Sequence, residues 1–215
     1  MNRSLLRLLA VAALTIGMAP AAFAQDDDDS VLNPLEPDVT VASLATNMRL
    51  PKWKSDFRLT HRFEGPLGNN GIGALFGLDE GAQVGIEFRL GVVKGGQVGF
   101  YRTTDKTIQF FGEYAVLRQA EHGLDVSAIV GVEGTDNFQD KYSPSFGAVI
   151  SRKVGGVVAL YVEPTLVNNS NPLPKQLVDH NNTVLVGIGA RVRIRPTVYL
   201  VGEVTPRAGY APNKN

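Results

Sequence analysis

The sequence predicts an all-β fold, an antiparallel up-and-down β-barrel of about nine to ten long strands whose C-terminal end is expected to be incomplete. The first observation is that apolar residues alternate with polar, charged or glycine residues between residues 83 and 92. Side chains alternate across a strand, so this pattern indicates one apolar face and one polar face. The second observation is length, because these runs approach the roughly 9–11 residues that a tilted strand needs to cross a bilayer.

The expected strands follow one another along the chain with turn residues between them. Three of them form a meander between residues 82 and 117. The others are 57–64, 124–133, 145–153, 157–167, 183–195 and 197–205. The turns after the even-numbered strands are short, whereas those after strands one, five and seven are long. Short turns at one rim and long loops at the other are typical of outer-membrane barrels, with the N-terminus at the periplasmic rim.

The N-terminal part of the chain has the features of an export signal. Residues 1–24 contain two basic residues, an apolar core and a final Ala-Phe-Ala, which predicts a cleaved signal peptide. Residues 25–50 are expected to be a flexible periplasmic segment that begins with an acidic run at 26–29. Within it, 39–50 could form a short strand or a turn of helix near the barrel mouth. The barrel domain is expected over 51–215.

Composition narrows the class of protein further. The 215 residues carry 21 Lys and Arg against 21 Asp and Glu, so no basic surplus favours a nucleic-acid partner. The absence of cysteine excludes disulfides and a lipoprotein anchor. No stretch after the signal peptide is apolar enough for a transmembrane helix, so a membrane-embedded form would need strands closed into a barrel.

One face of the strands is expected to contact lipid, and the other is expected to line the lumen of the barrel. Val84, Ile86, Val184, Val186 and Ile188 are expected to face lipid. The expected lumen-lining residues are Glu87, Arg89, Glu113, Asp125, Glu133, Arg191, Arg193 and Glu203. Charges of both signs can pair there, which favours a packed, non-conducting interior in a barrel of this size. The orientation of strand seven stays open, because Glu163 has the same parity as Val157 and Tyr161.

Several segments resemble an uncharacterised bacterial β-barrel family, a domain of unknown function with an outer-membrane-type barrel. The similar segments are 48–52, 57–63, 75–79, 98–107 and 194–199. The resemblance spans about residues 48–210 and implies a β-barrel of the outer membrane. It implies no activity, because the family has none assigned.

These features lead to three functional hypotheses. The first is a non-enzymatic outer-membrane barrel acting as a structural, binding or limited-permeability element, with outer-membrane lipid and the barrel-assembly machinery as partners. The second is a barrel enzyme that modifies envelope lipids, and the third is a soluble periplasmic barrel that binds an apolar ligand. The enzyme is disfavoured because His61, His122 and His180 lie apart and no nucleophile motif accompanies them. No catalytic residue, cofactor or metal site is expected, and the sequence identifies no small-molecule ligand.

The number of expected strands indicates whether the barrel can close. Nine crossings would leave strand nine at an unpaired edge or force a parallel closure on strand one, whereas bacterial single-chain barrels have even strand numbers. Either 39–50 supplies another strand or the chain is a shortened version of a longer barrel, and the second alternative is favoured. An incomplete barrel with strand nine at an edge is therefore expected.

The signal peptide gives the first testable prediction. The mature exported protein should begin at or near Gln25, because signal peptidase cleaves after the small-x-small tripeptide. N-terminal sequencing of protein from the cell envelope measures this directly. Retention of residues 1–24 would contradict the prediction.

Overall fold

The computed structural model describes residues 35–63, 81–171 and 181–209. The expected signal peptide, the acidic run and most of the loop that begins at residue 65 lie outside these residues. Among the described residues, no helix is both long and apolar enough to cross a membrane.

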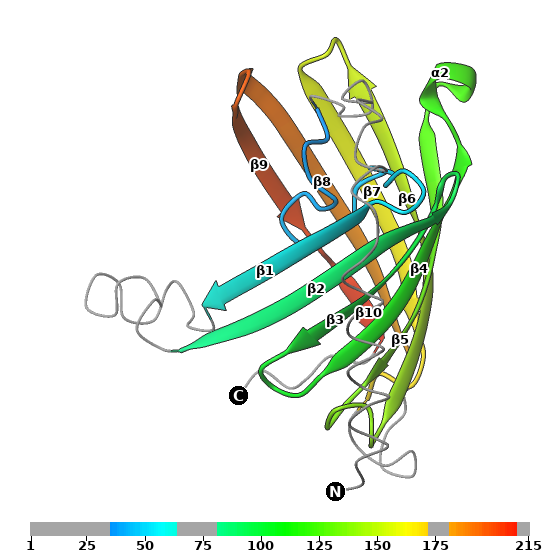
Figure 1. Cartoon of the computed structure of the whole chain (residues 1–215), viewed down its shortest axis with the longest axis vertical. Helices are drawn as coiled ribbons and strands as arrows, with labels where there is room; N and C mark the ends of the chain where they lie inside the picture. Colours follow the sequence, from blue (N-terminus) through cyan, green and yellow to red (C-terminus); the bar gives the residue numbers. More distant parts are fainter. Residues whose placement is uncertain (1–34, 64–80, 172–180, 210–215) are drawn as a thin grey trace, which may run out of the picture. The chain divides into compact units, whose positions relative to one another are not determined.

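The described chain forms one antiparallel sheet in which consecutive strands are neighbours (Figure 1). The nine long strands in these ranges are β1 (Ser55–Phe63), β2 (Ala82–Val93), β3 (Gly96–Thr103), β4 (Ile108–Leu117), β5 (Asp125–Gly134), β6 (Tyr142–Val154), β7 (Val158–Val167), β8 (Thr183–Arg195) and β9 (Val198–Val204). A four-residue helix, α2 (Gln119–His122), lies between β4 and β5. The predicted all-β, up-and-down fold is confirmed.

The register of the strands preserves the two unlike faces that the sequence predicts. Phe57 is paired with Phe88, Phe88 with Phe100, and Phe100 with Phe110, which makes a row of four phenylalanines across β1 to β4. Paired residues of neighbouring strands share a face, so this row marks one side of the sheet. The opposite side carries the charged positions, including Glu87.

The sheet is curled and open in its described part, as expected for an incomplete barrel. β1 pairs with β2, and β9 pairs with β8, with no pairing between β1 and β9 among the described strands. Beyond Pro206, β10 (Arg207–Gly209) also pairs with β8, next to the segment that β9 covers. Pro206 separates β9 from β10 because proline has no backbone N–H for the ladder. Strand nine therefore lies at an edge, as predicted.

The segment before β1 differs from the expectation of a flexible periplasmic tail. Residues 35–50, here called the inner segment, lie inside the curl of the sheet and are drawn in blue in Figure 1. Thr40 and Ala45 form an isolated bridge within it, and Val39, Thr46 and Asn47 are buried. The part of residues 25–50 that the structure describes is thus packed against the sheet. Its residues are held there by contacts with strands far along the chain.

The inner segment joins β1 through a tight contact with β2. Trp53 N–H donates to Gly91 O at 2.7 Å, and Gly91 N–H donates to Lys54 O at 2.9 Å. A Cβ at position 91 would lie 2.2 Å from the backbone oxygen of Pro51. Gly91 is therefore needed for the close approach of two backbones.

Gly91→Ala should lower the free energy of unfolding by about 1–3 kcal/mol, because the backbone at Pro51 would have to move. The measurement is a denaturant titration of the detergent-folded protein. Gly202→Ala is the matched control, since a Cβ there meets no atom within 4 Å. Equal stability of the two variants would show that the approach at Gly91 is not tight.

Candidate functional site

The face of the sheet that the inner segment covers, here called the inner face, carries all eight residues expected to line a lumen. The structure differentiates them by burial. The buried members are Glu87, Arg89, Glu113, Asp125 and Arg191. Arg193 and Glu203 are half-buried, and Glu133 is exposed. The buried five and Glu203 contact either one another or the inner segment, whereas Glu133 and Arg193 stand apart from the contacts described below.

Glu203 on β9 holds the inner segment by its backbone. Its carboxylate accepts hydrogen bonds from Ala42 N–H at 3.1 Å, Ser43 N–H at 2.9 Å and Leu44 N–H at 3.1 Å. The next amide, Ala45 N–H, donates to Glu163 Oε2 on β7 at 2.9 Å. Successive backbone N–H groups form a concavity suited to anions, and here two carboxylates of the same chain occupy it. β7 and β9 are thereby tied to the inner segment.

Asn47 makes a second set of contacts, with β5 and β6. Its side-chain amide donates to Ser151 Oγ at 2.8 Å and to Val149 O at 3.3 Å. Ser127 Oγ donates to Asn47 Oδ1 at 2.6 Å. All these groups are buried, and a buried polar group left without its partner is costly, so the position of Asn47 is tightly specified.

Charged side chains fix the start of the inner segment. Lys153 Nζ lies 2.8 Å from Glu36 Oε2 and 2.8 Å from Asp125 Oδ2, so it bridges the segment and the sheet. Arg191 Nη2 donates to Thr40 O at 2.7 Å. Removal of the inner segment would leave the buried guanidinium of Arg191 without this acceptor and would leave Lys153 with Asp125 alone.

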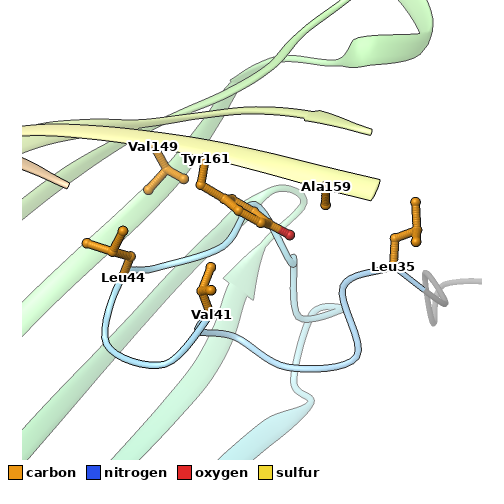
Figure 2. Close-up of a cluster of buried hydrophobic side chains, with 6 residues drawn as sticks. All are labelled: Leu35, Val41, Leu44, Val149, Ala159 and Tyr161. Atoms are coloured by element: carbon orange, nitrogen blue, oxygen red, sulfur yellow. The ribbon is translucent and has the colours of Figure 1, made fainter. Parts of the chain in front are cut away.

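Apolar contacts complete the docking of the inner segment. Figure 2 shows Leu35, Val41 and Leu44 facing side chains of β6 and β7. Tyr161 and Val149 are the sheet residues at the centre of this cluster, and both are almost completely buried. The apolar inner-face positions of β6 and β7 are therefore explained by what covers them.

A charge network lies beside the inner segment on β1 to β4. Arg58 and Arg89 both pair with Glu87, and Arg58 also donates to Thr40 Oγ1. Arg89 lies 3.7 Å from Glu113 Oε2, which accepts a hydrogen bond from Gln97 Nε2 at 2.7 Å. This network spans four strands and one loop residue, so it links the inner segment to the side of the sheet opposite β9.

A cavity of about 260 Å³ remains between the inner segment, β1 to β5 and Glu163 of β7. Its polar walls are Arg58, Arg62, Glu87, Arg89, Tyr101, Gln109, Glu113 and Glu163, together with Thr40 and Ser43 of the inner segment. Phe111 and Ile129 form its apolar wall. The described residues contain no group of three or more His, Cys, Asp or Glu placed to hold a metal ion.

Sequence reasoning identified the charged inner-face positions but missed the residues of the inner segment and Glu163. The alternation within each strand is local and visible in the sequence. The partners of Glu203 lie about 160 positions away along the chain, and no local pattern signals such a contact. The apolar residues at 35, 39, 41 and 44 were the available signal that this segment is packed.

An antiparallel sheet with an apolar outer face and a charged, covered inner face defines the class of membrane β-barrel domains. The chain belongs to the family described as membrane bound beta barrel domain (DUF5777), whose model matches residues 38–215. The match begins inside the inner segment, in agreement with the packing of that segment against the sheet. No curated protein and no solved structure matches the chain.

Glu203→Gln should accelerate hydrogen exchange of the amides of residues 42–44 by roughly five- to tenfold. The neutral amide is a weaker acceptor than the carboxylate, which holds three N–H groups. Hydrogen–deuterium exchange with mass spectrometry measures this locally.

Glu133→Gln is the matched control, because it makes the same chemical change at an exposed inner-face position. Faster exchange in both variants, or in neither, would show that Glu203 does not retain the inner segment.

Proposed function

We propose that this protein is a non-enzymatic outer-membrane β-barrel protein whose interior is filled by its own N-terminal inner segment, and that it acts as a binding element. The export signal expected at residues 1–24 supports an envelope location. Outer-membrane lipid and the barrel-assembly machinery are the partners this proposal implies. The filled inner face favours binding over free diffusion of large solutes.

The observation that carries the proposal is the outer face of the sheet. Each of the nine long strands in the described ranges exposes at least one large apolar side chain there, for example Phe57, Ile86, Phe100, Phe110, Val130, Phe146, Leu160, Ile188 and Leu200. Phe57 and Leu200, on the two outermost long strands, are 65% and 64% exposed. A continuous apolar band outside and paired charges inside is the arrangement that hydrocarbon requires. A water-soluble barrel would place these faces the other way round.

The unpaired edges of the sheet restrict how this protein can be embedded in a bilayer. Backbone groups at an unpaired edge cannot remain in hydrocarbon, because each costs several kcal/mol without water to bond. In a bilayer the free edges of β1 and β9 must therefore be paired or shielded from lipid.

Ile188→Arg tests the membrane assignment of the outer face. Ile188 lies near the middle of β8 and is exposed, so an arginine there should cost about 2–4 kcal/mol on insertion. The readout is the fraction of protein that folds into phospholipid vesicles across a urea series.

Arg193→Gln on the same strand is the control for the other face, and it should insert nearly as well as the wild type. A wild-type protein that stays folded and soluble without detergent would support the soluble apolar-ligand barrel instead. Equal insertion of the two variants would also contradict the assignment.

A further inference from the structure

The four-residue turn that joins the inner segment to β1, residues 51–54 and here called the Trp53 turn, contains a tryptophan with an unusual backbone conformation (Figure 1). Lys54 N–H donates to Pro51 O at 3.0 Å, which closes the turn with Trp53 at its third position. The φ angle of Trp53 is 66°, in the left-handed region, where glycine or asparagine is the usual choice at this position of a turn. A left-handed conformation costs a bulky residue free energy, and strained residues of this kind are concentrated at functional sites.

The strained backbone presents the ring of Trp53 to the outside of the protein. The side chain is 69% exposed, more than any other large apolar side chain in the described ranges. Two hydrogen bonds to Gly91 fix the turn, because Trp53 N–H donates to Gly91 O at 2.7 Å and Gly91 N–H donates to Lys54 O at 2.9 Å. Packing within the protein therefore does not explain why a tryptophan is held in this conformation.

The Trp53 turn lies where the apolar outer face of β1 begins. Ser55 pairs with Leu90, which shares the outer face with Phe88, and the next outer-face residues of β1 are Phe57 and Leu59. These two side chains are 65% and 64% exposed. Tryptophan is enriched at membrane–water interfaces, because its apolar ring contacts acyl chains while its indole N–H reaches the polar layer. The end of an apolar band is the height at which such an interface is expected.

The charges beside Trp53 indicate what kind of surface the turn fits. Lys52 and Lys54 are both exposed, and neither has an ion-pair partner among the described residues. Lys52 Nζ lies 5.4 Å from the centroid of the Trp53 ring, within the range of a cation–π contact. Basic residues close to a membrane surface are attracted to anionic lipids. An aromatic ring between two cations without carboxylate partners is therefore complementary to a layer of anionic headgroups.

We propose that the Trp53 turn binds the headgroup region of anionic phospholipids, with the indole ring beside the start of the acyl chains and with Lys52 and Lys54 paired with lipid phosphates. The inference rests on the membrane role proposed above and names the lipid class and the residues that recognise it. A protein partner is the other occupant that an exposed tryptophan could accept, and the experiment distinguishes the two.

Trp53 is the only tryptophan of the chain, so the fluorescence of the wild type reports on this turn alone. The full mature chain is folded into vesicles of phosphatidylcholine and phosphatidylglycerol in equal amounts. Bromine atoms, which quench tryptophan at short range, are attached to the acyl chains either near the carboxyl end or near the methyl end. Bromines near the carboxyl end should quench Trp53 at least about twofold more strongly, because an interfacial ring lies beside the start of the chains.

The preference for anionic lipid is measured by placing the bromines near the carboxyl end on only one of the two lipids. Brominated phosphatidylglycerol should quench the wild type about twofold or more as strongly as brominated phosphatidylcholine. The double variant Lys52→Gln, Lys54→Gln should lose this preference. The matched control is Lys106→Gln with Lys141→Gln, which removes the same charge at the opposite rim of the sheet and should retain the preference.

Inserted protein whose Trp53 emission is quenched by neither brominated lipid would overturn the inference in favour of a protein partner. Equal quenching by the two lipids in the wild type, or loss of the preference in the control variant, would also overturn it. These outcomes leave the membrane role itself standing, because Ile188→Arg tests insertion separately. Failure of the wild type to insert would contradict both proposals.

Discussion

The structure depends on how the charged face of its sheet is covered. Each strand has one apolar and one polar face, and a single curled sheet has no second sheet to pack against its polar inner face. Another part of the same chain must therefore cover that face. In this protein the inner segment performs that role, through backbone N–H groups bound by Glu203 and Glu163 and through the buried amide of Asn47. Most of these contacts are polar, because the face they cover is polar.

The position of the inner segment also explains the composition of individual strands. Inner-face positions of β2 to β4 carry charge where they meet one another, as with Glu87 and Arg89. Inner-face positions of β6 and β7 carry Val149 and Tyr161 where they meet Val41 and Leu44. The small residues Gly187 and Gly189 on β8 leave room for the Leu44 side chain. The inner face thus carries a paired charge network on β2 to β4 and an apolar cluster on β6 and β7, with Glu163, Arg191 and Glu203 beside that cluster.

Local features of the strands could be predicted from the sequence, whereas the contacts that cover the inner face could not. Strand positions follow from local alternation and were predicted correctly. The register also keeps the two sets of alternating residues on opposite sides of β2 and β8. The orientation of strand seven could not be assigned, because Tyr161 is apolar in character yet points inward with Glu163. The flexible tail predicted for residues 25–50 was wrong for the described part, since this part is packed against partners that include residues more than 100 positions later. Long-range contacts of this kind leave no periodic pattern in either segment.

The contacts that hold the inner segment and the charge network beside it differ in whether their polar atoms are all satisfied by the protein. Glu203 and Asn47 have their hydrogen-bonding capacity met by the protein, so they act as anchors. Arg58 and Glu113 keep one buried polar atom each without a protein partner, although both belong to the ion-pair network around Arg89. Both atoms have almost no accessible surface, so neighbouring protein atoms enclose this part of the network. Burying them costs free energy, which the satisfied contacts of Glu203 and Asn47 must offset if the inner segment is to stay in place.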